Sequence, residues 1–64
     1  MKNNKRNVLE TAYCNDFVDN IDFSIKYLEK LYKEGYLTNR HKVGNRIVYW
    51  LSEKGLEWLE KEKR

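Results

Sequence analysis

The chain has 64 residues, of which 41% are hydrophobic and 36% charged, and its formal net charge is +3. This length allows one small domain over residues 1–64, with residues 1–6 expected to be flexible, and the hydrophobic content is that of a folded chain. No apolar run is long enough to cross a membrane or to act as a signal sequence. We therefore expect a cytoplasmic protein, or one encoded by a virus or plasmid that acts inside the cell.

Cysteine and histidine each occur once, as Cys14 and His41. A single cysteine excludes an intrachain disulfide, and one cysteine with one histidine cannot form a structural zinc site. We expect Cys14 to be a small buried apolar residue. The sequence also has no glycine-rich phosphate loop, so we expect no catalytic residues, no metal and no cofactor.

The first part of the chain predicts two helices. Apolar residues at helical spacing predict a first helix over residues 5–14. A short second helix is expected from Asp16 to Asn20 or Ile21, capped by Asn15 or Asp16. All the aspartates of the chain lie within residues 16–22, so this segment would repel phosphate if it faced a duplex.

The main helix is expected over residues 22–34, with Asn20 or Asp22 as its N-cap and Gly35 as its stop. One stripe of this helix is predicted to face the core, and it consists of Ile21, Ile25, Leu28, Leu31 and Tyr32. The opposite side carries aromatic and basic residues, namely Phe23, Lys26, Tyr27, Lys30 and Lys33, of which Lys33 is explained by a solvated helix face. Such a surface suits the major groove of DNA, and the alternative is a solvated helix face.

Two strands are expected next, Tyr36–His41 and Arg46–Leu51, joined by a tight turn in which Gly44 tolerates positive φ. The stretch between Asn39 and Arg46 is basic and contains no acidic residue; it holds Arg40, His41, Lys42 and Arg46. Alternation along the second strand turns Ile47, Tyr49 and Leu51 toward the main helix, whereas Arg46, Val48 and Trp50 point away.

The last helix is expected to begin at Ser52, whose side chain would cap it. Leu56 and Leu59 should pack inward, and Gly55 should allow a close approach to a neighbouring element. Trp50 and Trp58 leave two interpretations open, because either ring could pack on the edge of the core or form a dimer or partner interface.

The order of the expected elements, with two motifs in it, resembles the winged helix-turn-helix domain of small MarR-, PadR- and ArsR-like transcriptional regulators. The first motif is the end of the main helix with its glycine stop, and the second is the junction from strand to last helix; the matching residues are Leu28, Leu31, Gly35, Tyr36, Leu37, Tyr49, Leu51, Ser52 and Gly55. The resemblance implies a mainly α fold with a small β-hairpin: three helices, a two-stranded wing and a C-terminal helix.

The resemblance also implies that residues 22–34 form the recognition helix of a DNA-binding regulator. Its outward residues would enter the major groove, and these are Phe23, Ser24, Lys26, Tyr27 and Lys30. The wing, about residues 39–47, would lie on the sugar-phosphate backbone or minor groove through Arg40, Lys42, Asn45 and Arg46.

Double-stranded DNA is therefore the expected partner, and a homodimer is expected because one small domain makes few phosphate contacts. The alternative function is a protein-interaction module on the same fold, such as an accessory factor of a virus or mobile element. An enzyme is the weakest hypothesis, and neither a membrane nor a small-molecule ligand is expected as a partner.

Overall fold

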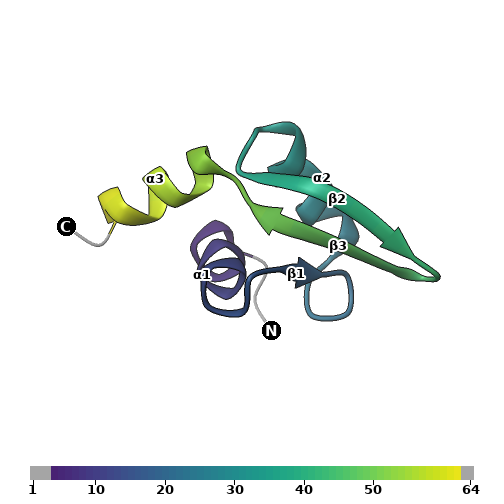
Figure 1. Cartoon of the computed structure of the whole chain (residues 1–64). Helices are drawn as coiled ribbons and strands as arrows, with labels where there is room; N and C mark the ends of the chain where they lie inside the picture. The colour runs from purple at the N-terminus through teal and green to yellow at the C-terminus, as the bar shows by residue number, and fades with distance from the viewer. Residues whose placement is uncertain (1–3, 63–64) are drawn as a thin grey trace.

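The computed structural model describes residues 4–62, which form three helices and a three-stranded antiparallel sheet. The elements follow in the order α1 (Lys5–Asn15), β1 (Val18–Asp19), α2 (Ile25–Lys33), β2 (Leu37–Val43), β3 (Arg46–Leu51) and α3 (Glu53–Glu62). The strand order in the sheet is β1-β3-β2. Figure 1 shows that α3 lies at the end of the molecule opposite the tip of the β2–β3 hairpin. No helix among the described residues is both long and apolar enough to span a bilayer.

The predicted first helix is confirmed as α1, one residue longer than expected. Asn4 caps it, because its side-chain oxygen accepts a hydrogen bond from the Asn7 N–H at 2.7 Å. Its buried residues are Val8, Leu9 and Ala12. Cys14 is exposed, so its prediction as a buried residue was wrong.

The predicted short second helix was wrong. Val18 and Asp19 instead form β1, which pairs with Tyr49 and Val48 of β3. Residues 20–24 then turn the chain, and this turn is held by the Asp19 carboxylate together with one backbone hydrogen bond, from the Phe23 N–H to the Asp19 carbonyl at 3.3 Å. The expected two-stranded sheet therefore has a third strand.

The main helix begins at Ile25, three residues later than predicted, with Ser24 at the N-cap position. Ile21, which was predicted to be buried, is 73% exposed because it lies in the turn before the helix. The predicted stop at Gly35 is confirmed, with φ at +94°. The Tyr36 N–H donates to Leu31 and the Gly35 N–H to Tyr32, the pair of bonds that defines a Schellman motif.

The hairpin is confirmed, although β2 runs from Leu37 to Val43 rather than from Tyr36 to His41. Gly44 and Asn45 form its two-residue loop, with positive φ at Gly44 alone, as a type II′ turn requires. A β-bulge interrupts β2, where Asn39 adopts a φ of +53°. Thr38 pairs with Trp50, and His41 pairs with Val48. Asn39 and Arg40 lie between these two pairs, so two residues of β2 are opposite one residue of β3, Tyr49.

The helices share their core with one face of the sheet. Residues from every helix and strand contribute to it, namely Val8, Leu9, Ala12, Val18, Phe23, Leu28, Leu31, Leu37, Tyr49 and Leu59. The register places Phe17, Val48 and Trp50 on the other side, which we call the outer face, and none of these three belongs to the core cluster. The predicted alternation along β3 is therefore confirmed.

The junction between β3 and α3 is built around Ser52 and Gly55. The Gly55 N–H donates to the Ser52 hydroxyl oxygen at 3.1 Å, which confirms Ser52 as the cap, and that hydroxyl donates to the carbonyl of Gly35. The predicted close approach of Gly55 is also confirmed, since its Cα faces the carbonyl of Tyr36. Leu56 was predicted to pack inward, but only Leu59 is buried, and Leu56 is exposed.

Candidate functional site

Three lysines form one exposed stripe along α2. Lys26, Lys30 and Lys33 are all exposed, and their spacing of four and three residues places them within about 60° of one another around the helix. We call these residues the lysine stripe. Lys26 and Lys30 were predicted site residues. Lys33 was predicted to lie on the same side of the helix, but it was interpreted as a solvated residue and not as part of the site.

The aromatic residues predicted beside these lysines are not exposed as expected. Phe23 is only 3% exposed and belongs to the core, because it precedes the first residue of α2 and does not follow the helical periodicity. Tyr27 packs partly against the core, and the Lys30 Nζ lies 5.9 Å from its ring centroid. Ser24 is exposed at the start of the helix. The exposed face of α2 is therefore basic rather than aromatic and basic.

The hairpin lies beside this stripe through a contact between Arg40 and Glu29. The Arg40 Nε is 3.3 Å from a Glu29 carboxylate oxygen, and the Tyr49 hydroxyl donates a hydrogen bond to the same oxygen. Burial, together with the neighbouring Glu29 carboxylate, raises the pKa of Tyr49, so its hydroxyl remains a donor. Arg40 offsets the negative charge of Glu29, so this acid does not cancel the positive charge of the lysine stripe.

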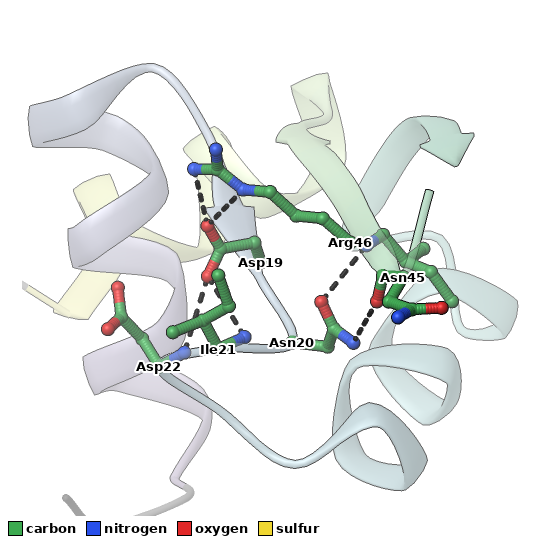
Figure 2. Close-up of polar contacts among 7 residues, drawn as sticks. Asp19, Asn20, Ile21, Asp22, Asn45 and Arg46 are labelled. Atoms are coloured by element: carbon green, nitrogen blue, oxygen red, sulfur yellow. Dashed lines mark hydrogen bonds and ion pairs between the residues drawn. The ribbon is translucent and has the colours of Figure 1, made fainter. Parts of the chain in front are cut away.

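A second ion pair holds the base of the turn that precedes α2. Arg46 contacts Asp19 Oδ2 through Nη2 at 2.7 Å and through Nε at 2.9 Å, as Figure 2 shows. The other Asp19 oxygen accepts the N–H groups of Ile21 and Asp22 at 3.1 and 3.3 Å. Burial of the Asp19 side chain (6% exposed) raises its pKa, but the Arg46 bond and the two N–H groups outweigh burial, so the pKa is lowered overall.

This ion pair changes how two predicted features are understood. Arg46 was predicted as a wing residue, and its guanidinium is already held by Asp19, while its side chain remains 46% exposed. Asp19 was part of the acidic segment expected to repel phosphate, and its charge is compensated internally. Asp16 and Asp22 of that segment are exposed.

Asn20 fixes the hairpin near its tip. Its side-chain N–H donates to the Asn45 carbonyl at 3.1 Å, and its side-chain oxygen accepts the Ile47 N–H at 3.0 Å (Figure 2). The Asn20 backbone N–H also donates to the Ile47 carbonyl at 3.3 Å. The hairpin thus has a fixed orientation relative to the turn before α2. Its exposed residues near the tip include the predicted Lys42 and Asn45.

Both tryptophans are half-buried and have aromatic or cationic neighbours. The Trp50 ring lies 6.4 Å from the Phe17 ring on the outer face, and the Arg46 guanidinium lies 5.3 Å from Phe17. Trp58 packs against the core, and the Lys5 Nζ is 4.6 Å from its ring centroid. These contacts favour the interpretation that the tryptophans pack on the edges of the domain.

The more exposed apolar side chains lie elsewhere. Tyr13 of α1 is 54% exposed and Leu56 of α3 is 36% exposed, and the two line one shallow groove with Leu59 and Glu60. Ile21, Val43 and Tyr32 are exposed too, although Tyr32 was predicted to face the core. Within residues 4–62, no group of three or more His, Cys, Asp or Glu residues could hold a metal ion.

Comparison of the chain with protein-family models, with curated proteins and with solved structures found no significant match.

Proposed function

We propose that this protein is a winged-helix DNA-binding regulator that contacts double-stranded DNA through α2 and the β2–β3 hairpin. The order of elements, with a helix before the hairpin and a helix after it, supports the winged-helix assignment. In this arrangement β1 and the start of the turn that follows it stand where a short second helix was expected.

The observation that carries the proposal is the lysine stripe on the exposed face of α2 (Lys26, Lys30, Lys33), with Lys42 on the adjoining hairpin. Lysine ammonium groups on a helix can reach the phosphates on both sides of the major groove. Two acids line the same surface as these lysines, Glu29 and Glu34, and Glu29 has Arg40 as its partner. Three lysines against the remaining acid, Glu34, leave a net positive charge that can act on a polyanion.

The test is binding to duplex DNA across a salt series. Four lysine–phosphate contacts would give a slope of about −3.6 for log K against log salt. Changing Lys26, Lys30 and Lys33 together to Gln should reduce the magnitude of that slope by about 2.7. The matched single variants are Lys30→Gln, which should reduce it by about 0.9, and Arg6→Gln, which should leave it unchanged because Arg6 is paired with Glu10 on α1.

A folded protein that binds no duplex at low salt would contradict the proposal. So would equal slopes for the wild-type protein and the triple variant. We further propose a homodimer as the DNA-bound form, since one domain offers few phosphate contacts. Sedimentation of the complex with DNA should then show two protomers per duplex, and one protomer would exclude it.

A protein-interaction module is the second candidate function, and the Tyr13–Leu56 groove favours it. Exposed apolar side chains that lie together often mark a protein interface. If this is the function, Tyr13→Ser with Leu56→Ser should abolish capture of the partner protein. The same double variant should leave the salt slope of duplex binding unchanged, because it alters none of the lysines, and this distinguishes the two candidates.

A further inference from the structure

A second group of basic residues lies beyond the C-terminal end of α2, where α1 and α3 meet the start of β2. Its members surround two aromatic rings, and we call them the lysine–aromatic cluster: Lys5, Tyr36, Lys54, Trp58 and Lys61. The Lys5 Nζ is 3.6 Å from the Tyr36 ring centroid and 4.6 Å from that of Trp58. The Lys54 Nζ is 4.6 Å from the same Tyr36 ring.

The charges in this cluster do not balance. Tyr36, Lys54, Trp58 and Lys61 line one shallow groove with a single acid, Glu57. Lys5 and Lys54 bring two ammonium groups to the same ring, so these like charges repel each other. Cation–π contacts stabilise each ammonium group only weakly at such exposed sites. An anion seated in the groove would relieve the repulsion.

The cluster adjoins the lysine stripe at the end of α2. The Lys54 Nζ donates to the carbonyl of Glu34, the C-cap residue of α2, at 2.7 Å. Glu34 also borders the surface that Lys26, Lys30 and Lys33 line. An ammonium group has three N–H donors, and this hydrogen bond uses one of them.

The length of α2 indicates which anion would reach the cluster. Nine residues span about 13.5 Å at 1.5 Å per residue, which is close to the width of the major groove, about 12 Å. A helix whose N-terminal end contacts base edges therefore has its C-terminal end near the sugar-phosphate backbone. Lys54 is hydrogen-bonded to that end of the helix, at the carbonyl of Glu34.

We propose that the lysine–aromatic cluster binds a phosphate of the same DNA duplex that α2 and the hairpin contact. This inference rests on the proposed DNA-binding function. Lys54 and Lys61 donate to the phosphate, and Lys5 contributes positive charge while it remains on the two rings. Glu57 opposes binding because it is the acid that lines the groove.

The experiment compares salt slopes of duplex binding for the wild-type protein, Lys54→Gln/Lys61→Gln, Lys61→Gln, and Arg6→Gln as the control. The double variant should reduce the magnitude of the slope by about 1–2, and Lys61→Gln alone should reduce it by about half as much. Glu57→Gln should tighten binding, an effect that a purely structural role of the cluster would not produce. Thermal unfolding of each variant checks that the fold is retained, since Lys54 also binds the end of α2.

Two outcomes would overturn the inference, and they have different meanings. If the double variant has the wild-type slope while Lys30→Gln lowers it, the cluster does not contact DNA and the proposed function stands. If the wild-type protein itself binds no duplex, the proposed function and this inference fail together.

Discussion

At the scale of single residues, the Asp19 side chain joins the turn before α2 to Arg46 of β3. This side chain accepts hydrogen bonds from the backbone of the turn and from Arg46, and it lies almost fully buried at the end of a two-residue strand. Hydrogen bonds to a charged group stabilise a fold by about 1.5–3 kcal/mol each at most, and here several depend on one carboxylate.

We expect Asp19→Asn to lower the free energy of unfolding by about 2 kcal/mol at pH 7, measured by urea denaturation. The pKa of Asp19 is lower in the folded state than its unfolded value of about 3.9, so the carboxylate stabilises the fold above that pH. This stabilisation is lost as the pH falls through the folded pKa. The difference between wild type and variant should therefore shrink below about pH 4.

The control for this prediction is Asp22→Asn, which changes an exposed carboxylate in the same turn. It should alter stability by less than about 0.5 kcal/mol at either pH. An effect of Asp22→Asn as large as that of Asp19→Asn would contradict the role given to the buried carboxylate.

Gly55→Ala gives a second prediction, because helix propensity favours this substitution and packing opposes it. In an exposed helix, replacing Gly with Ala stabilises by about 1 kcal/mol. Here a Cβ would overlap the Tyr36 carbonyl oxygen and lie 2.7 Å from Leu51 Cδ1. We expect Gly55→Ala to lower the midpoint of chemical denaturation, at a cost of about 1–3 kcal/mol. A raised midpoint would show that α3 can move away from Tyr36 and Leu51.

At the scale of elements, the bulge in β2 decides which side chains face α2. The bulge includes Asn39, whose backbone adopts the left-handed conformation. Without the extra residue, the alternation of β2 would shift by one, and Arg40 would lose its place beside Glu29.

We therefore expect Asn39→Gly to leave stability unchanged or slightly raised, because glycine adopts positive φ without strain. Asn39→Val should destabilise by about 1–2 kcal/mol, because a β-branched residue is strained there. Thermal unfolding of the two variants compares them directly. Equal midpoints would mean that the bulge can move along the strand.

The elements that were predicted correctly are those whose limits depend on local residue chemistry. Gly35 ends α2 and Gly44 turns the hairpin, because both adopt positive φ. Ser52 begins α3, because its hydroxyl oxygen accepts the Gly55 N–H. Each of these limits can be read from one residue. The strand β1 could not be predicted in this way, because two residues carry no periodicity and Val18 is extended only because it pairs with Tyr49. The late start of α2 has the same cause, since Asp19 holds the preceding turn.

The candidate site was predictable to a similar degree. Helical spacing places Lys26 and Lys30 on one exposed stripe whatever else the chain does. The pairing of Arg46 with Asp19 joins residues 27 positions apart, and no sequence pattern indicates it. Phe23 was misplaced because the helical wheel was extended to a residue that is not helical.

At the scale of the whole molecule, the helices pack against one face of the sheet. The outer face is covered by the side chains that project from it. Leu28 is fully buried in the core, whereas Trp50 is half-buried against Phe17. A domain of this size has a total stability of about 3–10 kcal/mol, so one core truncation can remove much of it.

We expect Leu28→Ala to cost about 2–5 kcal/mol and to leave much of the protein unfolded at 37 °C. Trp50→Ala should cost less than half as much, because part of the ring is already in contact with water. Circular dichroism at 37 °C and urea denaturation test both variants. An equal loss would mean that the outer face contributes to stability as the core does.

The hydrogen bonds from Asn20 to Asn45 and Ile47 have a consequence for the thermodynamics of binding. They attach the far part of the hairpin to the body of the domain before any partner arrives. A partner that contacts the hairpin then loses little free energy to ordering it. The heat-capacity change on binding should accordingly reflect only the surface that is covered, without the larger negative value of coupled folding.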